Sequence, residues 1–206
     1  MRQRLPRDYA ADHLTSLKHY RSEWYGAVME AMFGRNCIWS PVNDVARQKS
    51  GIDVSVTNWL GQQFFVDDKF RSKDYGDLLV ETMSDRLNRR LGWMIKHGMR
   101  CDWLHYAILP SRISYFVAYR AFRIAFAAHQ EWMEFARTRR HGFSFDQSSS
   151  CCGDRQWTTD FMCIPVRVVR AEIGCTIVRW DDAMARHARS ISSEIDRLMG
   201  LERGPC

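Results

Sequence analysis

The stretches Gly51-Ile52-Asp53 and Phe64-Phe65-Val66-Asp67-Asp68-Lys69-Phe70 predict the centre of the fold. Their apolar residues indicate two adjacent β-strands over residues 51–57 and 62–71, joined by a short turn. Successive side chains of a strand point to opposite faces, and the chain rises about 3.3 Å per residue. The predicted pair of strands therefore fixes which of these polar side chains meet.

Asp67 and Lys69 lie two residues apart, so they share one face of the second strand, whereas Asp68 points to the other face. The first strand supplies Asp53 as a second carboxylate. Hard oxygen ligands of this kind suit Mg²⁺, which keeps several waters and shares the phosphates of its substrate. A lysine beside such a metal can orient or deprotonate an attacking water. The competing interpretation is that Asp53 occupies a turn and the others form a solvated strand edge.

The order Asp53, a spacer, then Asp67-Asp68-Lys69 resembles the PD-(D/E)XK nuclease superfamily over roughly residues 15–120. Ile52 stands where the family usually has proline. The resemblance implies an α/β fold, with a central mixed β-sheet flanked by helices in a restriction-endonuclease-like core. It implies a deoxyribonuclease that depends on Mg²⁺ (or Mn²⁺) and hydrolyses phosphodiester bonds in DNA. Asp53 and Asp67 would bind the metal, and Lys69 would position the water.

Residues 8–33 predict one amphipathic helix, because apolar residues recur every three or four positions until Gly34. In the resembling family a glutamate on this first helix often adds a metal ligand. Glu23 is the first choice for that ligand and Glu30 the second. The alternative is that both glutamates are simply solvated.

The remaining pattern predicts a single domain over residues 1–206, with a core of about residues 8–137 and a C-terminal strand–helix elaboration of about residues 155–200. Asp77 precedes a third strand and Glu81 lies within it, and each either points toward the site or makes a structural hydrogen bond. We expect a mobile loop over residues 142–155. The other expected elements are a connection at 35–50 with one helical turn, strands at 78–82, 101–109 and 112–119, a helix at 120–137, a hairpin of strands at 161–169 and 173–180, and a helix at 181–199.

The formal net charge of +6 fits a polyanionic partner. Basic residues gather after the third predicted strand, between Thr82 and Arg100, with one tryptophan among them, and this mixture suits phosphate contact and base stacking. Trp93 fits a core position equally well. The candidate nucleic-acid-binding residues are Arg71, Lys73, Arg86, Arg89, Arg90 and Trp93.

Seven cysteines without a Cys-x-x-Cys pair favour a reduced, cytoplasmic setting. His141, Cys151, Cys152 and Cys163 match no standard zinc spacing. Phosphate-binding loops, dinucleotide fingerprints, His-Glu-x-x-His and Gly-x-Ser-x-Gly motifs do not occur. No apolar run predicts a membrane span, and a homodimer is compatible with the pattern. Two other functions stay open: an inactive nuclease-like module that binds nucleic acid or protein, and an interaction or inhibitory protein.

Overall fold

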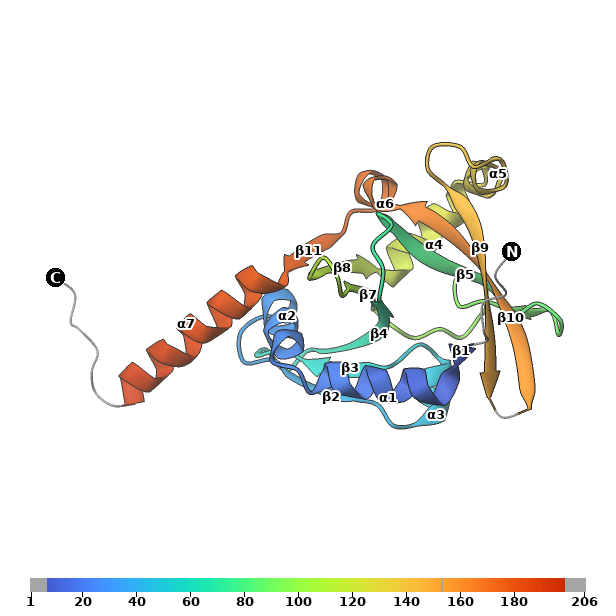
Figure 1. Cartoon of the computed structure of the whole chain (residues 1–206). Helices are drawn as coiled ribbons and strands as arrows, with labels where there is room; N and C mark the ends of the chain where they lie inside the picture. The colour runs from blue at the N-terminus through green and yellow to red at the C-terminus, as the bar shows by residue number, and fades with distance from the viewer. Residues whose placement is uncertain (1–6, 153, 199–206) are drawn as a thin grey trace.

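The computed structural model describes residues 7–152 and 154–198 and shows a mixed α/β protein built on two β-sheets (Figure 1). The first sheet has six strands in the order β11-β8-β7-β4-β3-β2. Its pairs are antiparallel except β4 with β7, which is parallel, so the sheet is mixed. The bounds of its strands are β2 Ile38–Pro41, β3 Val54–Thr57, β4 Gln63–Arg71, β7 Trp103–Ile108, β8 Ile113–Ala118 and β11 Thr176–Arg179.

The second sheet has five strands in the order β1-β9-β10-β5-β6. Its long antiparallel core joins β10 to both β5 and β9. Residues from 155 onward are therefore part of the central architecture and not an appendage, because β10 lies between two other strands and β11 extends the first sheet. The bounds are β1 Arg7–Asp8, β5 Asp77–Asp85, β6 Arg90–Leu91, β9 Ser144–Cys152 and β10 Arg155–Pro165.

Two hydrophobic cores lie on opposite faces of the six-stranded sheet, because alternate side chains of one strand enter different cores. In β7, Leu104 and Tyr106 pack into the core shared with the five-stranded sheet, whereas Ala107 packs into the other core. β8 repeats the division with Val117 and Phe116. The sheet is thus buried on both sides, which explains why β7 reads as a nearly continuous apolar and aromatic run.

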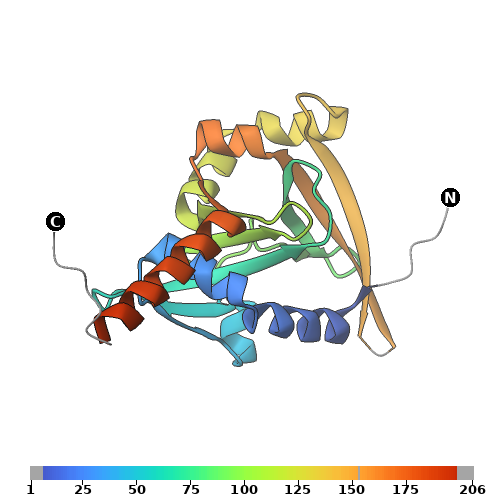
Figure 2. The same ribbon diagram turned by 60° about the vertical axis from the view of Figure 1, so that its left-hand side comes forward.

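Seven helices are present in the described residues, and all of them except α3 contribute buried side chains to one of these two cores (Figures 1 and 2). Helices α2 and α7 bury side chains in one core, whereas α4 and α5 bury theirs in the core between the sheets. Helix α1 runs along the molecule from the end of β1 to the start of α2. The bounds are α1 Tyr9–Tyr20, α2 Glu23–Phe33, α3 Val45–Lys49, α4 Tyr119–Ala128, α5 Glu131–Thr138, α6 Val166–Glu172 and α7 Trp180–Leu198.

Two of the three long helices expected from the sequence are broken in the structure, whereas the third forms the single helix α7. The helix expected over 8–33 stops at Tyr20, because Ser22 adopts an extended conformation and its hydroxyl bonds to the carbonyl of His19. The helix expected over 120–137 stops at Ala128. There His129 leaves helical geometry, bonds to Glu131 and stacks on a tryptophan. In each case a polar side chain competes with the helix while the apolar period continues across the break.

The expectations for three other segments were wrong in the structure. The expected loop at 142–155 contains β9, whose polar residues Ser144–Cys152 pair with the apolar strand β10. Residues 161–180 do not form a hairpin, because Pro165 ends β10 and α6 follows, so β10 and β11 belong to different sheets. The connection expected at 35–50 also includes an edge strand, β2. The single turn of α3, the terminal helix α7 and a strand within 173–180, which is β11, are confirmed, and the strand expected at 161–169 is confirmed as far as Pro165.

Candidate active site

Asp67 and Lys69 lie side by side on β4, as the strand period predicted. The ammonium group of Lys69 pairs with Oδ1 of Asp67. Asp68 points to the opposite face, where its Oδ2 accepts a hydrogen bond of 2.7 Å from the hydroxyl of Tyr25 on α2. The strand alternation therefore separates one carboxylate that faces the lysine from a second that faces the helical layer.

Asp53 precedes β3 and is fixed to its neighbours by the backbone. Its N–H donates to the carbonyl of Val66 at 2.9 Å, and its carbonyl accepts from the N–H of Val42 at 2.8 Å. Its side-chain Oδ2 accepts from the N–H of Asp68 at 3.0 Å. The hairpin of β3 and β4 thereby brings the Asp53 carboxyl to the same corner of the sheet as Asp67.

The charges at this corner perturb one another strongly. Burial raises the pKa of Asp53, and the charge of Asp67 raises it further, against the opposing effect of Lys69. Burial acts against the charge on Lys69, but the carboxylates of Asp67 and Asp53 outweigh it and raise the pKa of the ammonium. The carboxyl groups of Asp53 and Asp67 repel each other when both are ionised, and Lys69 is the cation beside them. A further positive charge at this corner would therefore stabilise the ionised pair.

One oxygen of Asp67 accepts no hydrogen bond from an N–H or a hydroxyl group, and the neighbouring Asp53 can bond to Asp67 only when Asp53 carries a proton. Asp67 is only 3% exposed, and its Oδ2 is buried without such a hydrogen bond. Such an atom loses its hydration without compensation, which costs roughly 1–3 kcal/mol or more for a charged group. A divalent cation beside Asp67 and Asp53 would satisfy it. Mg²⁺ commonly takes only one or two protein carboxylates, so this donor set fits that ion.

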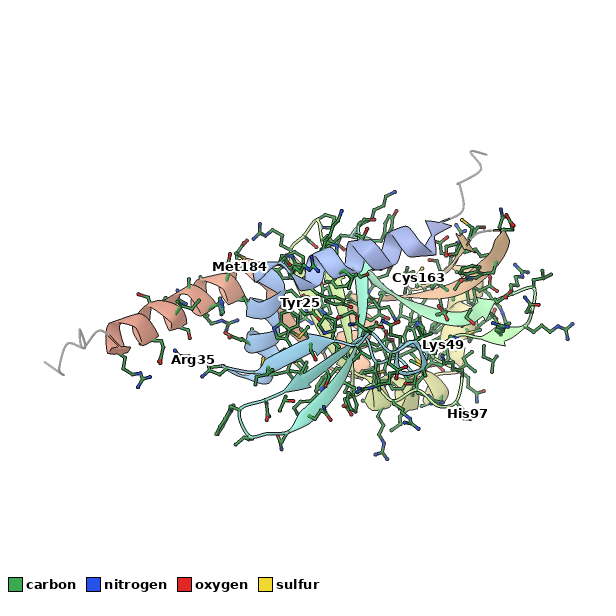
Figure 3. All side chains as sticks on the ribbon, turned by 90° about the horizontal axis from the view of Figure 1, so that it is seen from below. Tyr25, Arg35, Lys49, His97, Cys163 and Met184 are labelled. Atoms are coloured by element: carbon green, nitrogen blue, oxygen red, sulfur yellow. The ribbon has the colours of Figure 1, made fainter. Side chains whose placement is uncertain are left out.

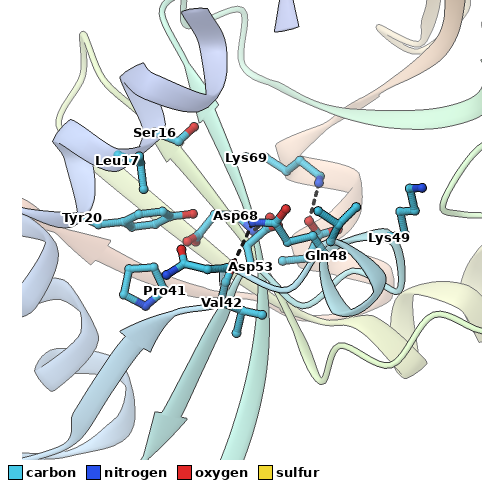
Figure 4. Close-up of a pocket in the computed structure, with 13 residues that line it drawn as sticks. Ser16, Leu17, Tyr20, Pro41, Val42, Gln48, Lys49, Asp53, Asp68 and Lys69 are labelled. Carbon is cyan, nitrogen blue, oxygen red and sulfur yellow. Dashed lines mark hydrogen bonds and ion pairs between the residues drawn. The ribbon is translucent and has the colours of Figure 1, made fainter. Parts of the chain in front are cut away.

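A cleft of about 300 Å³ opens over these groups (Figure 4). Its floor is formed by the three aspartates and Lys69, and its walls come from α1 on one side and the segment around α3 on the other. Tyr20 points from α1 toward the aspartates. The wall residues are Ser16, Leu17, Tyr20, Pro41, Val42, Asn43, Val45, Gln48 and Lys49.

A buried chain of hydrogen bonds holds Asp68 from behind. Nδ1 of His105 lies 2.6 Å from Oδ1 of Asp68, and Nε2 of His105 lies 2.8 Å from Oγ of Ser114. The indole N–H of Trp180, at the start of α7, donates to the same Oγ at 2.9 Å. An indole only donates, so the hydroxyl hydrogen of Ser114 is free to serve His105.

The order Ser114, His105, Asp68 is that of a nucleophilic triad, but its environment is not. Ser114 and His105 are both 0% exposed, and the stacked rings of Trp24 and Trp180 lie beside the serine. A nucleophile needs a substrate within reach of its oxygen. The chain is therefore a structural connection between α7 and the floor of the cleft.

Asp77 and Glu81 both lie on β5, and the charged groups of the site act electrostatically on Glu81. Burial raises the pKa of Glu81, while Lys69 lowers it and Asp67 raises it again, which places all three groups in one electrostatic neighbourhood. Asp77 instead forms a buried ion pair, with its Oδ1 2.7 Å from the guanidinium of Arg71. Asp77 therefore takes the structural role that the sequence left open.

Neither helix glutamate reaches the carboxylates. Glu23 lines a separate hollow beside Trp180 and Met184, and it is absent from the lining of the cleft. Glu30 lies 2.8 Å from Nδ1 of His187 and ties α2 to α7. The prediction that Glu23 is a metal ligand was therefore wrong. The break before α2 turns this helix toward α7, so that α1, and not α2, lies beside the cleft.

The predicted nucleic-acid-binding residues divide into two that are buried and four that are exposed. Arg71 is buried in its ion pair with Asp77, and Trp93 is a core residue at 6% exposure with its ring near Lys69, so neither offers a free surface for a base or phosphate. The exposed members of the set are Lys73, Arg86, Arg89 and Arg90.

Residues 7–152 and 154–198 contain no group of three or more histidine, cysteine or acidic side chains placed to hold a metal ion. The zinc alternative thus has no cluster in this part of the chain, although the side chain of Cys152 lies outside what is described. A site made of two carboxylates, such as Asp53 and Asp67, is smaller than a group of this kind, so this absence does not bear on it. In the same part of the chain, no helix has the length and apolar character needed to cross a membrane.

The raised pKa of Asp53 predicts a pH dependence of stability. A carboxyl group that ionises less readily in the folded state binds more protons there than in the unfolded chain, so stability falls as pH rises from about 4 through its folded-state pKa. Chemical denaturation of the metal-free protein over this pH range should show that the free energy of unfolding falls as pH rises. The Asp53→Asn variant should not show this fall. If the free energy of unfolding changed with pH equally in wild type and in Asp53→Asn, the raised pKa of Asp53 would be contradicted.

Several contributors to the site had no clear signal in the sequence. Tyr20 is a member of the apolar stripe of the predicted first helix, Tyr25 carries no signal of its own, and His105 is an isolated histidine in a strand expected to be buried. The pairing of Asp68 with His105 across parallel strands could have identified the histidine, but it requires the order of strands. Gln48 lies five residues before Asp53, a spacing that is compatible with a place in the site or on the surface, and the structure puts it in the cleft wall.

No protein-family model matches this chain, and comparisons with curated proteins and with solved structures find no significant match.

Proposed function

We propose that the protein is a divalent-metal-dependent nuclease with a restriction-endonuclease-like core, and that it hydrolyses phosphodiester bonds in DNA. The observation that carries the proposal is the buried Oδ2 of Asp67, which accepts no hydrogen bond from an N–H or a hydroxyl group, beside Asp53 and Lys69 on the floor of an open cleft. A carboxylate oxygen left in this state suits a site that is completed by a cation. The resemblance of the Asp53…Asp67-Asp68-Lys69 pattern to the PD-(D/E)XK superfamily adds the reaction class.

Each side chain has a distinct role in this proposal. Asp53 and Asp67 would hold Mg²⁺ or Mn²⁺, which supplies Lewis-acid stabilisation of charge on the phosphate and a more acidic bound water. Lys69 donates hydrogen bonds to the attacking water or to a non-bridging phosphate oxygen. The water oxygen forms the new P–O bond, one ester P–O bond breaks, and the leaving oxygen takes a proton to become a hydroxyl end.

The ammonium of Lys69 is charged, because its pKa is raised by the carboxylates. In the metal-free protein it is therefore a donor and not a base. A cation between Asp53 and Asp67 weakens that support for the charge, which brings the pKa of Lys69 down toward the range useful for proton transfer.

The proposal is tested first at this lysine. We expect Lys69→Ala to lower the rate of plasmid cleavage in Mg²⁺ by about 10²-fold or more, because positioned proton-transfer groups contribute that much. Lys18→Ala is the matched control, since Lys18 is an exposed residue of α1 that does not line the cleft. Cleavage by purified Lys69→Ala at the wild-type rate would refute the role, and absence of cleavage by wild type in Mg²⁺ and Mn²⁺ would refute the nuclease.

A further inference from the structure

A group of basic residues lies along the α3 wall of the cleft. Helix α3 carries Arg47 and Lys49, and the segment at residues 96–100 carries Lys96 and Arg100. We call these four residues the α3 rim. Arg47, Lys49 and Arg100 are exposed, and Lys49 is also part of the lining of the cleft. The rim therefore begins where the cleft opens.

The two segments of the α3 rim are fixed to each other. The ammonium of Lys96 donates to the carbonyl of Lys49 at 2.6 Å, and the N–H of Arg100 donates to the carbonyl of Ser50 at 2.8 Å. Gly51 allows this close approach: a Cβ atom there would stand 2.2 Å from Cε of Met99, and its φ of 77° also favours glycine. Figure 3 shows the labelled Lys49 and His97 on these adjoining segments.

The charges of the α3 rim are not held in close ion pairs within the described part of the chain, although Lys96 acts on the carboxyl of Glu81 from a longer distance. None of its four cations forms an ion pair with a carboxylate there. The neighbouring acids are engaged by the backbone instead: Asp44 accepts from the N–H groups at the start of α3, and Asp102 accepts from the N–H of Phe65. The rim therefore presents a net positive surface on a rigid support.

From this placement we propose that the α3 rim binds the phosphodiester backbone of the nucleic acid whose scissile phosphate enters the cleft. The inference rests on the proposed nuclease function, and it assigns the flanking phosphates to α3 and not to the arginines that the sequence favoured. Arg86 and Arg89 lie in the turn between β5 and β6 and Arg90 begins β6; this turn projects past β10 in Figure 1, whereas α3 borders the cleft.

The test compares two triple variants of equal charge change. In the first, Arg47, Lys49 and Arg100 become glutamine; in the second, Arg86, Arg89 and Arg90 do. The affinity for a short fluorescent DNA duplex is measured by anisotropy at several salt concentrations in Ca²⁺, which permits binding while slowing cleavage. Each lost phosphate contact lowers the log–log salt slope by about 0.9, so the rim variant should lose about 2.7 and the turn variant much less.

Separate measurements keep this inference distinct from the nuclease proposal. The rim variant should keep the wild-type rise in melting temperature on adding Mn²⁺, because Asp53 and Asp67 are unchanged. If the salt dependence of DNA affinity fell only in the turn variant, the proposed role of the α3 rim would be wrong. The proposal of nuclease activity would be unaffected. Wild-type protein without metal-dependent cleavage, yet with a slope that depends on the rim, would overturn the nuclease and leave a DNA-binding surface.

Discussion

Asp53→Asn should abolish the response of the protein to metal without weakening the metal-free fold. The wild-type carboxyl has a raised pKa, because it is buried next to the charge of Asp67. Asparagine resembles its protonated form and can still accept the hydrogen bond from the N–H of Asp68. The variant is therefore expected to unfold at the same denaturant concentration as wild type, or at a higher one, in a chelating buffer.

The effect of metal should then differ sharply between the two proteins. A ligand that binds only the folded state at one hundred times its dissociation constant stabilises it by about 2.7 kcal/mol. Wild type should show a gain of this order during a Mn²⁺ titration, and Asp53→Asn should lose most of it. Cleavage should fall by about 10²-fold or more, because a metal contributes several kcal/mol to the transition state.

Asp182→Asn is the matched control for this experiment. Asp182 is an exposed aspartate at the start of α7, outside the lining of the cleft, so its metal response and cleavage should equal those of wild type. If Asp53→Asn cut plasmid at the wild-type rate, Asp53 would not be a metal ligand. If it instead lost stability and kept its metal response, Asp53 would be a structural residue.

The second large effect is expected at His105. Its ring is fully buried, stacks on Phe116 at a centroid distance of 4.4 Å and bonds to Asp68 and Ser114. His105→Ala removes these bonds and leaves a void. We expect a loss of about 3–5 kcal/mol in the free energy of unfolding, the size found when a large aromatic side chain in a core is cut back to alanine.

His129 provides a matched control of unusual closeness. It also stacks on an aromatic ring, Trp132, and also bonds through Nδ1 to a carboxylate, that of Glu131. Its side chain is 31% exposed, so His129→Ala should cost about 1 kcal/mol or less. The contrast isolates burial as the cause of the larger loss.

A further variant separates packing from hydrogen bonding at His105. His105→Phe keeps an aromatic ring but gives no donor to Asp68 and no acceptor to Ser114. A loss close to that of alanine is expected, because buried polar groups without partners carry the larger cost. Wild-type stability in His105→Phe would show that the ring matters only for its volume.

The corner of the sheet was predictable because it depends on short-range rules. The period of two in Phe64–Phe70 fixed the faces of Asp67, Asp68 and Lys69, and the hairpin brought Asp53 to them. Strands β4, β5, β7 and β8 and helix α7 were likewise legible from apolar patterns. These features need no knowledge of which strands are neighbours in space.

What could not be predicted depends on such neighbours. Strand β9 is polar along its length, so only its pairing with β10 makes it a strand. His105 meets Asp68 through a parallel pairing of β4 and β7, and Glu81 approaches Lys69 from the other sheet. The helix breaks at Ser22 and His129 depend on single side-chain contacts. Local periodicity contains none of this information.

The hairpin of β3 and β4 has a consequence for the entropy of the chain. The contact between Asp53 and Asp68 closes a loop of 15 residues, whereas the contact between Thr82 and Asp160 that joins β5 to β10 closes one of 78. For flexible loops this difference in length amounts to about 1.4 kcal/mol in favour of the shorter closure. Both carboxylates of the proposed metal corner thus lie within a single local meander, and the assembly of that corner does not wait for the distant strand that completes the second sheet.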